Sequence, residues 1–329
     1  MTPERNVSFE IAMAQSFPHE WKNWQRELSD CVACPHHCHA NRLTGSLGFC
    51  KTDAWCNISS ICIHRGEEPP ISGTKGICNI FFSRCNLQCV YCQNHQISTL
   101  IGPAPGNKMS LQEVVADVLK CLDAGCLNVG FVSPSHQVVQ MKAIIHAVRQ
   151  EGRNPVFVYN TNGYDTVDTL RSLEGLMDVY LPDMKYMNDA VAKQWSGAAD
   201  YPEVATAALR EMFRQKGTAV QFGDNGIAEA GLIIRHLLLP GQVQNSLDVL
   251  RFIAHELSPR VYVSLMSQYY PTDNVRNDAL LGRRPTYEEY TRVVSEMESL
   301  GMTRGWIQEM ASHASYRPDF EKDHPFEYQ

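Results

Sequence analysis

Short apolar runs alternate with amphipathic stretches along the chain from Ile77 onward. The apolar runs are rich in β-branched and aromatic side chains, which favours buried strands. The stretches between them place apolar residues three or four positions apart, which is typical of helices that cover a sheet. This alternation predicts a parallel α/β fold. We expect its strands at Cys78–Ser83, Asn128–Val132, Val156–Asn160, Asp178–Leu181, Leu232–Leu238 and Val261–Met266.

Helices are expected between these strands and after the last one. Ser110 and Glu113 have the spacing of a capping box. Thr286 opens the last helix, with Glu288 and Glu289 in its first turn. The pattern gives six βα units, and periodicity alone is compatible with both a partial barrel and an open doubly wound sheet. The expected helices are Ser110–Ala124, Gln137–Gln150, Asp165–Leu173, Pro202–Gln215, Ser246–Leu257 and Thr286–Leu300.

The first part of the chain has a different texture. Residues 1–30 are expected to be helical around two tryptophans. Residues 31–76 carry many Cys, Gly and Pro residues and show little periodicity in their hydrophobic positions. This predicts a loop-rich module that needs a cross-link to stabilise it. We therefore divide the chain into a helical and Cys-rich metal-binding extension, residues 1–76, and a barrel domain, residues 77–329.

Composition narrows the partners and the compartment. The 329 residues carry a net charge of −7 and no basic run, so nucleic acid is not an expected partner. No apolar run has the length of a membrane span, and the N-terminus lacks the order of a signal peptide. We therefore expect a cytoplasmic protein without a membrane partner. In that reducing compartment, the twelve cysteines indicate metal sites more than disulfides.

Three cysteines follow directly on the first expected strand. Cys85, Cys89 and Cys92 form a C-x3-C-x2-C motif at the end of a strand where α/β folds place their chemistry. Three thiolates can hold three irons of a four-iron cluster and leave the fourth iron open to a ligand. The alternatives are a zinc site with His95 as fourth ligand, or buried structural cysteines.

A second cysteine group lies nearer the N-terminus. Cys31, Cys34, Cys38 and Cys50 give C-x2-C-x3-C-x11-C in a segment with little core of its own, which predicts a second metal site. Zinc and an auxiliary Fe-S cluster both fit this donor set. One ligand can be replaced by a neighbouring histidine, namely His36, His37 or His39. The other cysteines share no spacing and are expected to be buried small hydrophobes: Cys56, Cys62, Cys78, Cys121 and Cys126.

The central motif, with Tyr91 before its third cysteine, resembles the signature of the radical S-adenosylmethionine (SAM) superfamily. The likeness extends over roughly residues 31–310, to a branch of proteins named for similarity to pyruvate formate-lyase activating enzyme. The segments that carry it are residues 64–73 (HRGEEPPISG), 85–94, 159–164 (YNTNGY), 180–186 (YLPDMKY), 235–241 (RHLLLPG) and 266–269 (MSQY).

The resemblance implies a partial (β/α)6 TIM-like barrel with a [4Fe-4S] cluster near its mouth. It implies that SAM binds the open iron and is cleaved reductively to methionine and a 5′-deoxyadenosyl radical, which abstracts hydrogen from an unassigned substrate. It further implies an electron donor such as flavodoxin or ferredoxin. A glycyl radical enzyme is a possible partner, as for the activating enzymes. The alternative class is a non-catalytic iron-sulfur or zinc protein that senses redox state or binds a partner.

The resemblance also implies a set of cofactor-binding residues, but no catalytic residue. Tyr91 would lie near the SAM adenine, Gly130 near its amino group and Asn160 near its ribose. Asp183 would lie near a monovalent cation and Lys185 near the SAM carboxylate, with Arg235 in a similar role. From the residues alone, these roles have alternatives. Tyr91 can be a core aromatic, Asn160 can belong to a turn, and Asp183 and Lys185 can form a plain salt bridge. We expect Glu67 and Glu68 in a solvated turn, and His136 either at the mouth or capping a helix.

Overall fold

The computed structural model describes residues 10, 12–310, 317–322 and 324–326. Its centre is a set of parallel strands, each hydrogen-bonded to the next. In sheet order they are β9 (Tyr262–Met266), β8 (Ala228–Leu237), β6 (Val179–Pro182), β5 (Val156–Thr161), β4 (Asn128–Val132) and β2 (Ile77–Phe82).

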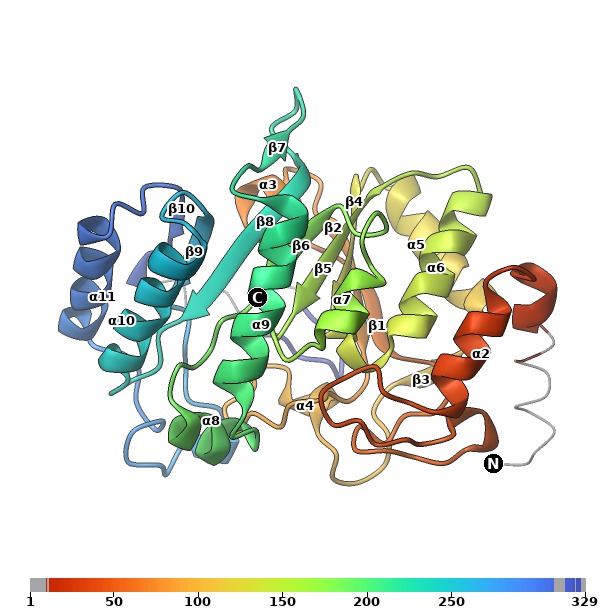
Figure 1. Ribbon diagram of the computed structural model, residues 1–329, viewed down its shortest axis with the longest axis horizontal. Coiled ribbons are helices and arrows are strands. Elements are labelled where there is room, and N and C mark those ends of the chain that lie inside the picture. The colour runs from red at the N-terminus through yellow and green to blue at the C-terminus, as the bar shows by residue number, and fades with distance from the viewer. Residues whose placement is uncertain (1–9, 11, 311–316, 323, 327–329) are drawn as a thin grey trace.

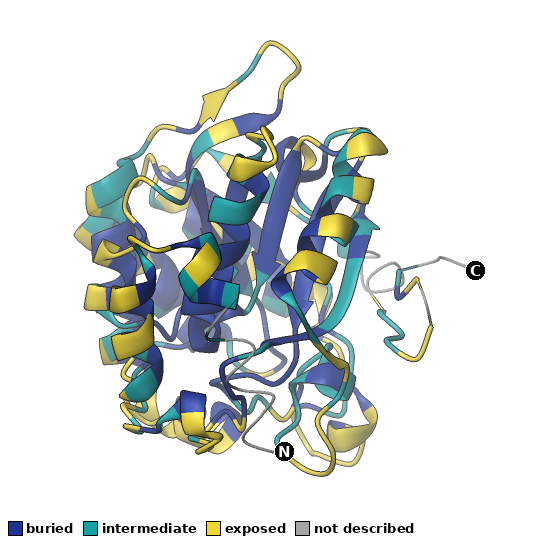
Figure 2. Ribbon diagram, turned by 90° about the vertical axis from the view of Figure 1, so that its right-hand side faces the viewer, coloured by how far each residue is buried: buried dark blue, intermediate teal, exposed yellow. Residues whose placement is uncertain are grey.

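Helices cover the outer face of this curved sheet (Figure 1). Their outward faces are exposed while the strands beneath them are buried (Figure 2). Each helix connects one parallel strand to the next or follows the last, as βα units require. The covering helices are α5 (Leu111–Asp123), α6 (Val138–Gln150), α7 (Val167–Arg171), α9 (Tyr201–Lys216), α10 (Val243–Phe252), with a π-helical turn at Ile253–Leu257, and α11 (Tyr287–Ser299). The fold is therefore the expected partial (β/α)6 barrel, and each expected strand and helix is present with small shifts of its ends.

Both predicted N-terminal helix signals are confirmed. The Ser110 hydroxyl accepts from the backbone of Glu113 while the Glu113 carboxylate accepts from the backbone of Ser110. Thr286 and Glu289 make the same reciprocal pair at the start of α11. These bonds satisfy backbone N–H groups that the helix itself leaves without partners.

The prediction of a loop-rich segment over residues 31–76 is wrong over Cys56–His64, which form a strand. Strand β1 (Cys56–His64) runs antiparallel to β2, and β3 (Asn107–Met109) runs antiparallel to β1. In β1 the alternation of apolar and polar residues is weak, because Asn, Ser and Cys interrupt its isoleucines. No clear strand pattern was therefore visible in the sequence here. At the opposite edge, β10 (Gly305–Ile307) adds a further parallel strand beside β9.

Several short elements complete the described chain. Helix α8 (Asp189–Ser196) precedes α9, and α4 (His95–Ser98) follows the cysteine motif. Strand β7 (Gln221–Phe222) forms a hairpin with the start of β8. Helix α3 (Pro69–Ser72) lies between β1 and β2, and there are 3₁₀ turns at Arg42–Thr44, Pro134–His136 and Asp273–Val275.

The N-terminal segment packs on the barrel. Helix α2 (Trp21–Ser29), which confirms the expected helix around the tryptophans, contributes Leu28 to the main core. The buried Arg42 guanidinium donates to the backbone carbonyls of Asp53 and His136. The boundary at residue 76 stays a prediction. Among the described helices, none has the length and apolar character needed to cross a bilayer.

Candidate active site at the barrel mouth

A cavity of about 290 Å³ lies at the carboxyl ends of the parallel strands. The loop that contains the cysteine motif forms one wall, with the thiols of Cys85, Cys89 and Cys92 on the cavity surface. In Figure 1, α4, which follows this loop, and α8 lie below the points of the strand arrows. Enclosure by several strand ends is the usual setting of an active site in α/β barrels.

The cysteine loop leaves β2 through a strained residue and is then held by α8. Arg84 has a positive φ of 69°, which is uncommon for a residue with a side chain. Its guanidinium donates to the carbonyl of Gly102 at 2.9 Å. Further along, the backbone N–H of Val90 donates to the carbonyl of Trp195 at 2.9 Å. The loop is therefore fixed at both ends by segments distant in sequence.

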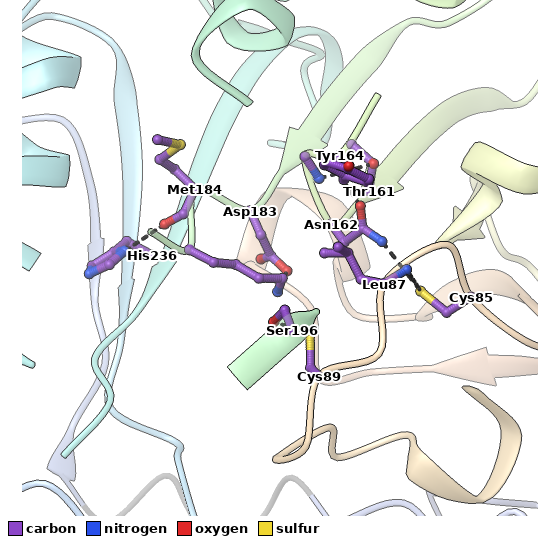
Figure 3. Close-up of polar contacts among 12 residues, drawn as sticks. Cys85, Leu87, Cys89, Thr161, Asn162, Tyr164, Asp183, Met184, Ser196 and His236 are labelled. Carbon is purple, nitrogen blue, oxygen red and sulfur yellow. Dashed lines mark hydrogen bonds and ion pairs between the residues drawn. The ribbon is translucent and has the colours of Figure 1, made fainter. Parts of the chain in front are cut away.

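Each thiol of the motif has a side-chain hydrogen-bond donor, and two of the three donors are distant in sequence. The Asn162 amide donates to Cys85 Sγ at 3.3 Å, and the Ser196 hydroxyl donates to Cys89 Sγ at 2.9 Å (Figure 3). The Ser98 hydroxyl donates to Cys92 Sγ at 3.4 Å. Donors aimed at sulfur stabilise the thiolate, which is the form that coordinates metal.

As free thiols, Cys85 and Cys89 resist ionisation. Burial raises the pKa of Cys85 to about 12 and that of Cys89 to about 11. Burial disfavours the charged thiolate, whereas a bound iron ion would stabilise it, because a metal cation deprotonates a coordinating thiol. No three His, Cys, Asp or Glu side chains within the described residues converge on a single-ion site. The three thiols do fit a cluster, in which each sulfur binds a different iron.

Tyr91 belongs to a chain of hydroxyl groups that ends on the cysteine loop. Its hydroxyl is 2.5 Å from that of Tyr186, which is 2.8 Å from the Ser196 hydroxyl. Since a thiolate only accepts, the Ser196 proton points to Cys89 and the Tyr186 proton can point to Ser196. Tyr91 is buried and lines the cavity, and its ring packs edge-on against Tyr269. Burial supports the core-aromatic interpretation, and the place of Tyr91 beside the SAM adenine stays a prediction.

Asp183 and Lys185 lie on the cavity wall after β6. Lys185 Nζ is 2.5 Å from Asp183 Oδ2. Burial disfavours the ammonium, but the Asp183 carboxylate and the neighbouring Cys89 raise the pKa of Lys185 above its ordinary value. Lys185 therefore brings a fixed positive charge to the surface that also holds Cys89.

Arg235 also lines the cavity, but its guanidinium is held by two carboxylates. Its Nε donates to Glu68 Oε1 at 2.8 Å, and a terminal nitrogen contacts both Glu68 and Glu67. Burial would raise the pKa of Glu67, yet Arg235 lowers it to about 2. The prediction of a solvated turn at Glu67 and Glu68 is wrong, because both carboxylates are buried against this guanidinium.

The other predicted residues are placed differently. Asn160 lines the cavity at the end of β5, whereas Gly130 lies inside β4 and is not among the lining residues. A Cβ on Gly130 would lie 2.2 Å from the side-chain oxygen of Asn79, so this glycine permits a close side-chain contact. His136 neither lines the cavity nor caps α6. It is buried, its Nε2 donates to the Ser83 carbonyl, and burial lowers its pKa to about 4.

The second cysteine group is brought together around one turn. Cys34 has the other three thiols, Cys31, Cys38 and Cys50, as electrostatic neighbours. Gly48 leaves room for this, because a Cβ there would lie 2.2 Å from Cys38 Sγ. All four are free cysteines. The remaining cysteines are buried, as predicted.

Sequence reasoning missed the residues that contact the thiols. The sequence placed Asn162 either near the SAM ribose or in a turn. Its side-chain oxygen does accept the Tyr164 N–H at 2.9 Å, as a turn requires, but its amide nitrogen faces Cys85. Ser196 carries no motif, and only tertiary folding brings it to Cys89. The Asn-Gly pair at the end of a strand was the available signal for Asn162.

Fold and site together define a class: a partial α/β barrel with the three cysteines of a C-x3-C-x2-C motif lining the cavity at its mouth. A family model described as the Radical SAM superfamily matches residues 79–253, which is more than half of the chain. The chain therefore belongs to the radical SAM superfamily. It is accordingly an enzyme of the radical SAM class, whose members use a [4Fe-4S] cluster and SAM.

Among curated proteins, the chain is 27% identical over 279 residues to an uncharacterized protein of Methanocaldococcus jannaschii, covering 84% of this chain and 76% of that one. It is also similar to three solved structures. One is a domain of pyruvate-formate lyase-activating enzyme from Bacteroides vulgatus, with 15% identity, a TM-score of 0.37, and coverage of 52% of this chain and 93% of that one.

The other two structures contain bound SAM. SuiB of Streptococcus suis matches with 10% identity and a TM-score of 0.47, over 71% of this chain and 50% of that one. The protein anSMEcpe matches with 12% identity and a TM-score of 0.47, over 68% of this chain and 61% of that one. The chain thus spans less than two thirds of either protein.

Proposed function

We propose that this protein cleaves SAM reductively with a [4Fe-4S] cluster held by Cys85, Cys89 and Cys92, and uses the product to abstract hydrogen from a substrate at the barrel mouth. The observation that carries the proposal is the placement of all three thiols, each with its own hydrogen-bond donor, on one cavity. When bound, the reduced cluster and SAM would supply the 5′-deoxyadenosyl radical.

The chain's own residues would bind and orient SAM beside the cluster. Lys185 offers a positive charge for the SAM carboxylate, with Asp183 fixing its position. Tyr91 offers an aromatic surface and Asn160 a polar side chain on the same cavity. Arg235 is less suited to a direct SAM contact than expected, because two carboxylates already occupy its donors. We retain Asp183 as the candidate neighbour of a monovalent cation.

Anaerobic reconstitution tests this function directly. The reduced protein should convert SAM to 5′-deoxyadenosine and methionine, and Cys89→Ala should abolish both products. Cys126→Ala is the control, because Cys126 is a free cysteine that lies outside the motif. A protein with an intact cluster that binds no SAM and forms no 5′-deoxyadenosine would instead support the non-catalytic class.

We further propose a cytoplasmic protein that receives its electron from a flavodoxin or a ferredoxin. Its substrate could be a glycyl radical enzyme, as the likeness to activating enzymes suggests, or another small molecule or peptide. Electron paramagnetic resonance on mixtures with glycyl radical enzymes of the same organism decides between these. A glycyl doublet supports activation, and its absence with every such enzyme excludes it.

A further inference from the structure

The segment that carries the four N-terminal cysteines lies directly against the loop that carries Cys85, because His36 contacts the backbone of Asn86. Residues 41–54 contribute only one short 3₁₀ turn, so regular structure does not explain how this segment is held. Backbone bonds close it instead: the Cys31 N–H donates to the Ala40 carbonyl at 3.2 Å, and the His39 N–H donates to the Cys31 carbonyl at 3.0 Å. These bonds bring the first and third cysteines of the group side by side.

The fourth cysteine reaches the group through a glycine. The Lys51 N–H donates to the Gly48 carbonyl at 3.1 Å, so the chain turns back at Cys50. Gly48 lies so close to Cys38 Sγ that no side chain fits there. Lys51, His37 and His39 all have positive φ, which is a conformational cost repeated around one short segment. Four cysteines in a segment with this conformational cost indicate that a bound metal offsets the cost.

His36, inside the cysteine motif, connects this group to the cluster loop. Its Nε2 donates to the backbone carbonyl of Asn86 at 2.8 Å. Its ring stacks on Phe49, with 3.6 Å between centroids, and Phe49 directly precedes Cys50. The ring edge also meets Tyr164 at 5.7 Å. One imidazole therefore contacts both arms of the cysteine group and the residue after Cys85.

The recipient of that bond is itself fully buried and bonded to the site. The Asn86 amide donates to the Tyr164 carbonyl at 2.7 Å, and its oxygen accepts from Asn162 at 2.8 Å. Asn162 also donates to Cys85 Sγ. A displacement of His36 would thus be transmitted through one residue to a thiol of the candidate cluster.

We propose that Cys31, Cys34, Cys38 and Cys50 bind a thiolate-coordinated metal centre, and that this centre holds Cys85 in place through His36 and Asn86. The thiols of the described chain do not converge on a single-ion site, so binding requires them to rotate onto the metal and to release their protons. His36 is in this view a positioning residue, since its ring already serves the Asn86 carbonyl. The coupling to Cys85 rests on the proposed SAM-cluster function, whereas the metal site does not.

The metal site is tested in a full-length chain that lacks the other cysteine motif. The variant Cys85→Ala/Cys89→Ala/Cys92→Ala, purified and reconstituted without oxygen, should retain about one zinc or one Fe-S cluster per chain. Elemental analysis and the visible spectrum distinguish the two. Adding Cys34→Ala and Cys50→Ala should remove the metal. A parent variant without stoichiometric metal, or with disulfides among these cysteines by mass spectrometry, overturns the proposal.

The coupling is tested in a chain with both motifs intact. His36→Ala should speed the chelator-induced loss of iron from the Cys85 cluster by about tenfold, as supporting residues of metal sites typically do, and should change its electron paramagnetic resonance signal. His36→Gln, whose amide can replace the Nε2 donor, should restore both. His255→Ala is the control, because His255 is exposed in the π-helical turn that follows α10.

The outcomes separate the two proposals. If His36→Ala behaves like His255→Ala while the N-terminal metal is present, the coupling is refuted and the metal site stands. If the N-terminal metal is absent while SAM is still cleaved, the further inference fails and the proposed function stands. If the N-terminal metal is retained while SAM is not cleaved, the N-terminal metal site stands and the proposed function fails.

Discussion

The hydrogen bond from Ser196 to Cys89 should tune the reduction potential of the bound cluster. Ser196→Ala removes the hydroxyl that donates to Cys89 Sγ at 2.9 Å and keeps a good helix former at the end of α8. A donor stabilises a sulfur more strongly after the cluster gains an electron. The variant should therefore have the more negative potential.

The size of the shift follows from the hydrogen bond. A bond to a charged partner contributes about 1.5–3 kcal/mol, and roughly half of that distinguishes the two redox states. A difference of about 1.4 kcal/mol corresponds to about 59 mV for one electron. Asn162→Ala and Ser98→Ala should give smaller shifts, because their donors lie 3.3 and 3.4 Å from sulfur.

A redox titration followed by electron paramagnetic resonance measures these shifts. Ser299→Ala is a matched control, since Ser299 also ends a helix but is exposed and donates to the Glu296 carbonyl. The reasoning is refuted if Ser196→Ala has the potential of Ser299→Ala, or a more positive one. A shift from Ser98→Ala larger than that from Ser196→Ala would contradict the dependence on distance.

Three further changes test the surroundings of the site. Arg235→Met should destabilise the cluster-free chain by about 3–5 kcal/mol in urea unfolding, because Glu67 and Glu68 lose their buried counter-ion. Adding Glu67→Gln and Glu68→Gln to this variant should recover most of the lost stability. No recovery would count against the charge argument. Burial lowers the pKa of His236 to about 4, below its ordinary 6.5, so the stability that depends on its neutral form is present above pH 6.5 and is lost as pH falls toward 4. His236→Asn should flatten the pH profile of unfolding over that window, and an unchanged slope would contradict it. Gly163→Ala should lower the melting temperature measurably, since φ is +82° and a Cβ would lie 2.3 Å from the Asp183 carbonyl; an unchanged melting temperature would show that the turn can relax.

The parallel strands were predictable because each is a short apolar run between turn residues. Asn128–Val132 was located to the residue. Strand β1 was missed because its Asn, Ser and Cys residues resemble loop composition, and its pairing with β2 and β3 stabilises it. Intrinsic preference is a weak guide where a neighbouring strand decides.

The candidate site also has a part that the sequence predicted and a part that it could not predict. The cysteine loop was predictable because its ligands lie within eight residues of one another and their spacing is set by the cluster. The donors to the thiols and the Glu67–Glu68–Arg235 group were not, because their partners are far away in sequence. No local pattern records a contact that exists only after the barrel closes.

The support of the cysteine loop by α8 also sets an order of events during synthesis. Cys89 depends on Ser196, which lies 107 residues later in the chain. At about 5–20 residues per second, a ribosome needs roughly 5–20 s to cover that interval. Until then Cys89 lies on a nascent segment without its donor. Delivery of iron and sulfide to this site should therefore follow release of α8 from the exit tunnel.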